Sequence, residues 1–162
     1  MKENKVLFLS QAAMIAAIYV VLCIAFAPIS YGAIQVRIAE ALTILPYFTP
    51  AAIPGLFIGC LIANLIGGSV LIDVIGGSIA TLLGATATWL LRKKSRYLAP
   101  IPPILANTLI VPFILRYGYG EPLPIPFLMA TVGIGELAAC GVMGLILLTV
   151  LSKYRKFIFR TA

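Results

Sequence analysis

Six charged or amide side chains interrupt apolar stretches of this sequence, and their types are those that bind a polar solute. A charged side chain inside a membrane span costs about 2.5–3.5 kcal/mol on insertion scales, so each one requires a partner or a function. Three carboxylates stand against one guanidinium, which favours a cationic or amidine-bearing solute whose N–H groups donate to carboxylate oxygens. The six residues are Arg37, Glu40, Asn64, Asp73, Asn107 and Glu136.

Structural roles remain open for most of these residues. Arg37 and Glu40 are three positions apart on an expected helix, where their side chains can pair with each other. Asp73 can cap the start of its helix, and Asn107 can bond to a neighbouring helix. Glu136 has no local partner within its apolar stretch and is therefore the strongest candidate for a ligand carboxylate.

Other kinds of chemistry lack the residues that they need. Histidine is absent, which excludes a serine–histidine hydrolase, and the single aspartate, Asp73, excludes a two-aspartate protease. Three cysteines, Cys23, Cys60 and Cys140, stand far apart and form neither a zinc-ligand spacing nor a CxxC pair. The sequence predicts no metal site, no cofactor and no enzymatic activity.

The elements that position these residues are expected to be membrane-spanning helices. Of 162 residues, 62% are hydrophobic and 10% are charged, and the mean hydropathy of +1.10 is far above that of a soluble domain. One spanning helix takes about 20 residues, so the chain has room for several. The net charge of +7 resides in three basic clusters beside apolar runs, which is typical of cytoplasmic loops and gives no reason to expect nucleic-acid binding.

These basic clusters determine whether the number of membrane-spanning helices between them is even or odd. They comprise Lys2 with Lys5, the group from 92 to 96, and the group from 153 to 160. If all three are cytoplasmic, an even number of helices separates each pair. We therefore expect an all-α protein with six transmembrane helices in a single domain over residues 1–162, both termini cytoplasmic, multi-pass in the cell (plasma) membrane and surrounded by lipid. The expected helices cover about 6–27, 33–48, 51–66, 71–91, 101–115 and 127–151.

On this topology the polar side chains lie in the outer half of the membrane or near its middle, as expected for a pocket that opens to the exterior. Tyr31 borders the same outer face and can stack on a flat heterocycle or a cation. Interfacial tyrosine is also common without any such role. Tyr31 is thus a candidate for binding the solute, with simple anchoring at the interface as the alternative.

A second feature lies on the first expected helix, where Ala12, Ala13, Ala16 and Ala17 form two overlapping small-xxx-small patterns. Small residues let another helix approach closely. The four alanines lie toward the cytoplasmic end, away from the expected pocket. They can therefore receive another protein or pack within the subunit itself.

Three stretches of sequence carry a family resemblance. They are YGAIQVRIAEALT from 31 to 43, PYFTPAAIPGLFIG from 46 to 59, and the Ala63-Asn64-Leu65 run with Asp73 following. With them the chain resembles, over nearly its whole length, the QueT family. This family contains substrate-binding S components of energy-coupling factor (ECF) transporters, a type of ABC importer, and is associated with queuosine precursors. The resemblance implies an S-component-like bundle of six helices.

The resemblance also implies a mechanism and partners. An S component binds its solute from outside, docks on a transmembrane coupling subunit driven by two cytosolic ATPase subunits, and topples in the membrane to release the solute inside. Docking uses an alanine-rich patch on the first helix, which the four alanines named above match. The chain itself has no GxxxxGK[ST] loop, so ATP hydrolysis is expected from the partners.

The substrate implied by the resemblance is 7-aminomethyl-7-deazaguanine or a close relative. Its guanine-like edge offers N–H donors and its aminomethyl group is a cation, so each part suits one carboxylate. Glu136 and Glu40 are expected to be the main ligand carboxylates, and Asp73 the next. Arg37 is expected to hold Glu40 in place, and the two asparagines to contact the remaining ring atoms.

Other functions remain open at this point. A solitary secondary transporter of a small cationic heterocycle would carry a coupling proton on Glu136 or Asp73, although such proteins usually show internal repeats and none is evident between the two halves here. An S component for another vitamin would keep the same fold and partners. A scaffold subunit without a ligand would leave the polar residues unexplained.

Overall fold

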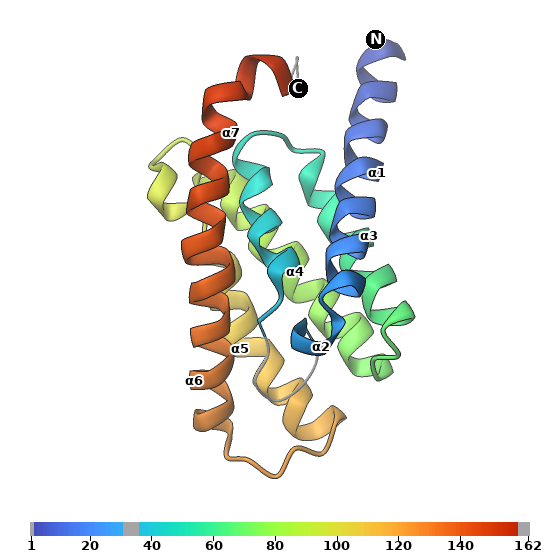
Figure 1. Ribbon diagram of the computed structural model, residues 1–162, viewed down its shortest axis with the longest axis vertical. Helices are drawn as coiled ribbons and strands as arrows, with labels where there is room; N and C mark the ends of the chain where they lie inside the picture. The colour runs from blue at the N-terminus through green and yellow to red at the C-terminus, as the bar shows by residue number, and fades with distance from the viewer. Residues whose placement is uncertain (1, 31–35, 159–162) are drawn as a thin grey trace.

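The computed structural model describes residues 2–30 and 36–158, and all regular structure in this part of the chain is helical, as the sequence predicts. The last three elements follow one another without a break and form one long helix (Figure 1). The elements are α1 (Lys2–Ala25), α2 (Ala27–Ser30), η1 (Ile38–Tyr47), α3 (Ala52–Ile66), α4 (Leu71–Leu91), η2 (Arg96–Leu98), α5 (Ile101–Gly118), α6 (Ile125–Glu136), η3 (Leu137–Met143) and α7 (Gly144–Ile158).

Four helical stretches among the described residues are long and apolar enough to cross a membrane. They are Lys5–Ala25, Leu71–Leu91, Arg96–Gly118 and Ile125–Arg155. The apolar helices η1 and α3 are shorter. At about 1.5 Å per residue, the 15 residues of α3 extend about 22 Å, less than the about 30 Å of a bilayer core.

The outer surface of the bundle is apolar. Large hydrophobic side chains such as Leu9, Leu71, Leu90 and Ile134 are exposed, whereas the acidic side chain of Glu40 is almost completely buried. A soluble domain rarely exposes apolar side chains in such continuous bands. This surface suits contact with lipid, and the interior holds the polar groups.

The second expected helix differs most from the prediction. Of the range 33–48, residues 33–35 lie outside the described residues, residues 36 and 37 are not helical, and Ile38–Tyr47 forms a 3₁₀ helix. A 3₁₀ helix rises about 2.0 Å per residue, so these ten residues extend about 20 Å. Residues 39–46 of η1 are all buried, and η1 contacts α1, α3, α4, η3 and α7, so it lies in the interior of the bundle.

The sixth expected helix contains a π-helical segment, η3, between α6 and α7. Buried residues recur at every fourth position through all three elements. In an unbroken α-helix this spacing drifts around the axis, because one turn takes 3.6 residues. The wider i→i+5 turn of η3 compensates for the drift, so the buried face continues inward from α6 to α7. The buried positions are Leu128, Val132, Glu136, Cys140, Gly144 and Leu148.

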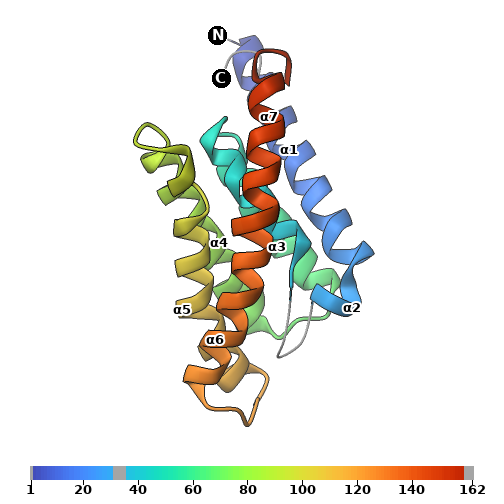
Figure 2. The same cartoon turned by 60° about the vertical axis from the view of Figure 1, so that its left-hand side comes forward.

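The start of α1 and the end of α7 lie at the same end of the molecule (Figure 1). The loop between α4 and α5, which contains the basic residues 92–96, lies toward that end as well. The loop between α5 and α6 lies at the opposite end (Figure 2). The described parts of the three basic clusters therefore lie toward one end of the bundle.

Close packing between α1 and α3 depends on small residues of both helices. Ala12 and Ala16 of α1 are buried, and they face Gly55 and Gly59 of α3. A Cβ atom at Gly55 would lie 2.7 Å from the backbone oxygen of Ala12, and one at Gly59 would lie 3.1 Å from Cα of Ala16. These contacts bring the two backbones together, as small-xxx-small pairs do in membrane helices.

Candidate functional site

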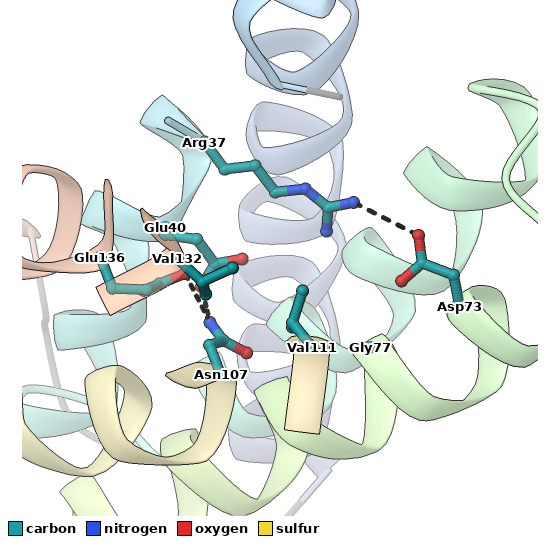
Figure 3. A pocket seen from close by; sticks show the side chains of 8 residues that line it. All are labelled: Arg37, Glu40, Asp73, Gly77, Asn107, Val111, Val132 and Glu136. Atoms are coloured by element: carbon teal, nitrogen blue, oxygen red, sulfur yellow. Dashed lines mark hydrogen bonds and ion pairs between the residues drawn. The ribbon is translucent and has the colours of Figure 1, made fainter. Parts of the chain in front are cut away.

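Polar residues from η1, α4, α5 and α6 meet around one small cavity (Figure 3). The cavity has a volume of about 20 Å³. This is room for about one water molecule. Its lining consists of Arg37, Glu40, Asp73, Gly77, Asn107, Val111, Val132 and Glu136.

One side of the site, here named the carboxylate cluster, consists of Tyr19, Glu40, Asn107, Glu136 and Cys140. Asn107 Nδ2 donates to Glu136 Oε1 at 2.9 Å and lies 3.4 Å from Glu40 Oε2. The phenol of Tyr19 donates to Glu40 Oε1, and Cys140 Sγ donates to Glu136 Oε2 at 3.0 Å. Neutral donors therefore orient both buried carboxyl groups, and no cationic side chain donates to them in these hydrogen bonds.

The other side, here named the arginine cluster, consists of Arg37, Asn64, Asp73 and Tyr119. Arg37 Nη2 donates to Asn64 Oδ1 at 2.9 Å and lies 3.9 Å from Asp73 Oδ2. Tyr119, just beyond α5, donates its phenol to Asp73 Oδ2 at 2.7 Å. Partial burial raises the pKa of the Tyr119 phenol above its usual value, so this group remains a neutral donor.

The sequence predicts that Arg37 holds Glu40 in place, and the structure directs the guanidinium toward Asp73 (Figure 3). The i, i+3 argument assumes that both residues belong to one helix. Arg37 instead precedes η1 with an extended backbone, at φ −84° and ψ 100°. Its side chain therefore extends toward α4, and Glu40 points toward Asn107.

The charge of the cavity lining is unbalanced. Among the described residues that line it, Arg37 is the one cationic side chain, and Glu40, Asp73 and Glu136 are acidic. If all four groups are ionised, their formal charges sum to −2. A ligand with one or two N–H-bearing cationic groups would offset this excess, whereas an anion would add to it.

The structure brings together six of the seven residues that the sequence predicts as substrate-binding. Five line the cavity, and Asn64 contacts two of those five, donating from Nδ2 to the backbone oxygen of Asp73 at 3.3 Å. Tyr31 lies outside the described residues. The five that line the cavity are Arg37, Glu40, Asp73, Asn107 and Glu136.

Sequence reasoning missed several residues of the site. Gly77 is one helical turn after Asp73, and a Cβ atom there would lie 2.9 Å from Asp73 Oδ1, so a larger residue would crowd the arginine cluster. Cys140 is one turn after Glu136, and this spacing is visible in the sequence. Tyr19 carries no local signal, because its partner Glu40 is 21 residues away on another element.

Cys140 adds a possible metal ligand to the two carboxylates of the carboxylate cluster. One side-chain ligand atom from each of Glu40, Glu136 and Cys140 lies within 4.8 Å of the other two, a grouping that a metal ion can use. In the structure, the thiol and the Asn107 amide donate to the carboxylate oxygens. The carboxylate oxygens of Glu136 thus accept an N–H and an S–H donor of the protein itself.

Comparison with known families identifies the kind of protein. Residues 9–153 match the family model described as QueT transporter. The chain belongs to the QueT family. A stretch of 66 residues is 38% identical to the queuosine precursor transporter QueT of Lactococcus lactis subsp. cremoris (strain MG1363), and it covers 40% of this chain and 39% of that protein. No solved structure matches the chain.

The predicted family is therefore confirmed, and QueT is a family of transporters, in agreement with the prediction that the chain is not an enzyme. In this QueT family member the four alanines of α1 divide into two pairs. Ala12 and Ala16 are buried against α3, whereas Ala13 and Ala17 are exposed on the outer face of α1. The exposed pair is the part of the predicted docking surface that a partner can reach.

Proposed function

We propose that this QueT family member is the substrate-binding subunit of an ECF-type importer for a queuosine precursor. The name of the Lactococcus lactis relative supports the precursor. The observation that carries the proposal is the pair of buried carboxylates, Glu40 and Glu136, bridged by Asn107 at a cavity with one cationic and three acidic side chains. Such a site suits a small, flat, nitrogen-rich cation.

The proposed ligand is 7-aminomethyl-7-deazaguanine or a close deazapurine. Its ammonium group would donate to both Glu136 and Glu40, the two carboxylates that contact Asn107 Nδ2, and Asn107 would contact a ring atom. Pockets for small molecules usually have volumes of about 300–1,000 Å³, far more than the present cavity. Binding therefore requires the lining to move apart, and ligand N–H groups then replace Asn107 as the donor to the carboxylates.

We place the protein in the plasma membrane with six crossings and both termini in the cytoplasm. Basic residues collect at the end of the bundle that holds both termini, which agrees with cytoplasmic loops. The two short helices, η1 and α3, supply the second and third crossings. Burial of η1 within the bundle removes the need for a full lipid-facing length.

The proposed partners are a transmembrane coupling subunit and two cytosolic ATPase subunits. The exposed Ala13 and Ala17 would form one part of the docking surface. Beside them, an apolar groove of about 400 Å³ lies between α1, η1 and α7 and would receive a partner helix. Its lining includes Leu7, Met14, Ile18, Leu42, Leu45, Leu147 and Leu151.

Equilibrium binding to the purified chain in detergent tests the proposed ligand. We expect 7-aminomethyl-7-deazaguanine to bind tightly and guanine to compete weakly, because guanine lacks the ammonium group. Uptake into cells should then require the ATPase partners. Uptake that continues without any ATPase would instead support a solitary transporter coupled to protons, and absence of binding would contradict the precursor as the ligand.

The proposed docking surface on α1 can be tested separately from the ligand site. Replacement of Ala17 by tryptophan adds a large side chain to the exposed face of α1, so we expect ligand binding to remain within about twofold while uptake falls at least tenfold. Ala130, an exposed alanine on α6, provides the matched control A130W. Equal uptake by A17W and A130W would show that this face of α1 does not dock.

A further inference from the structure

A phenol on α1 reaches the ligand site from a helix that contributes none of the residues lining the cavity. Tyr19 is completely buried, and its hydroxyl donates to Glu40 Oε1. The other carboxylate oxygen, Oε2, lies 3.4 Å from Asn107 Nδ2. Both oxygens of Glu40 therefore have a neutral donor, and one of these donors comes from outside the cavity wall.

The position of this phenol is fixed by packing. Tyr19 belongs to the core cluster that α1 forms with η1 and α3. A Cβ atom at Gly59 would lie 3.0 Å from Cβ of Tyr19, so the glycine lets α3 approach the root of the ring. Because interiors are close-packed, a large side chain held in this way has little freedom to turn.

The hydrogen bond from Tyr19 leaves acceptor positions of Glu40 open to a ligand. A carboxylate has about four acceptor positions, so Glu40 can keep its bond to Tyr19 and still accept from a ligand. The phenol carries no charge, so it orients Glu40 without placing a positive charge beside it, and an ionised Glu40 can then pair with a cation. A neutral ligand with the same ring gains much less binding free energy from a carboxylate that is oriented in this way.

We infer that Tyr19 is a positioning residue that gives the site its selectivity for a cationic over a neutral ligand. It acts through Glu40 and does not touch the ligand itself. The inference rests on the proposed function, since it concerns the same cavity and the same class of ligand.

The experiment compares two ligands that share a ring: 7-aminomethyl-7-deazaguanine, which is a cation, and its neutral 7-cyano counterpart. Tyr19→Phe removes only the hydroxyl. We expect the Kd of the aminomethyl ligand to rise about tenfold, because Glu40 is no longer held in place and its side chain must be ordered when the cation binds, and the Kd of the cyano ligand to change less than twofold. Tyr47→Phe, a phenol of η1 packed against the same core cluster, is the control and should change neither Kd.

Two results would overturn the inference while the proposed function stands. One is equal weakening of both ligands in Tyr19→Phe, which indicates a packing role. The other is a ratio of the two Kd values that Glu40→Gln leaves unchanged. Because Tyr19 acts on the ligand through Glu40, this second variant tests the inference even if Tyr19→Phe fails to fold. Absence of binding of either ligand to the unmodified chain would overturn the proposed function and this inference together.

Discussion

Replacement of Glu136 by glutamine will weaken binding of 7-aminomethyl-7-deazaguanine by about 30-fold or more. Glu136 is buried, and Asn107 Nδ2 and Cys140 Sγ donate to its two oxygens, so the carboxylate is already oriented toward the cavity. Removing one partner of a buried charge pair typically costs about 2–5 kcal/mol, and each 1.4 kcal/mol is a factor of ten in Kd. Glutamine keeps the shape of the side chain and removes its charge.

The same substitution should not destabilise the ligand-free protein. Glu136 and Glu40 are both in contact with Asn107, and two carboxylates so close together repel each other when ionised. E136Q removes this repulsion, so we expect a melting temperature in detergent at or above that of the unmodified chain. Glu121, in the loop between α5 and α6, supplies the matched control E121Q, which should change neither quantity.

Titration calorimetry measures the Kd of the ligand, and thermal unfolding measures the melting temperature of each variant. Weak binding with an unchanged or higher melting temperature identifies Glu136 as a ligand group. Weak binding with a lower melting temperature would instead indicate that Glu136 supports the fold. Binding as tight as that of the unmodified chain would remove Glu136 from the proposed site, and Glu40 would then be the carboxylate to test next.

The sequence predicts the long helices well because their boundaries are local. The helix expected over 71–91 is found as Leu71–Leu91, between a glycine-containing turn and a basic cluster. In contrast, η1 is buried on nearly every side, carries Glu40 and Thr43 among its apolar residues and contains Pro46, so no period in its sequence distinguishes an α-helix from a 3₁₀ helix. Its geometry depends on the five elements packed around it, which a single sequence does not reveal.

The sequence likewise predicts the residues of the candidate site better than the contacts between them. Polar residues in apolar stretches are visible in the sequence because burying them is costly, and this signal leads to Glu40, Asn107 and Glu136. Which group each one contacts depends on how the helices pack. A tyrosine in an apolar helix resembles ordinary packing, so Tyr19 gives no such signal, and the partner of Arg37 on α4 follows from the extended backbone before η1.

Substitution of Gly55 by alanine will lower the stability of the protein, and the same change at Gly133 will not. Alanine favours a helix over glycine by about 1 kcal/mol at either position. At Gly133 the added Cβ atom would lie 3.5 Å from Thr108, an ordinary contact, so this gain remains. At Gly55 it would lie 2.7 Å from the backbone oxygen of Ala12, and α1 must move away from α3.

Overpacking of this kind costs about 1–3 kcal/mol or more, which exceeds the helix gain, so the melting temperature of G55A should fall by several degrees. A melting temperature of G55A equal to that of G133A would mean that α1 and α3 are not in close contact. The movement of α1 also carries Tyr19 away from Glu40. G55A should therefore lose selectivity for the cationic ligand as Tyr19→Phe does, although the substituted residue is not part of the site.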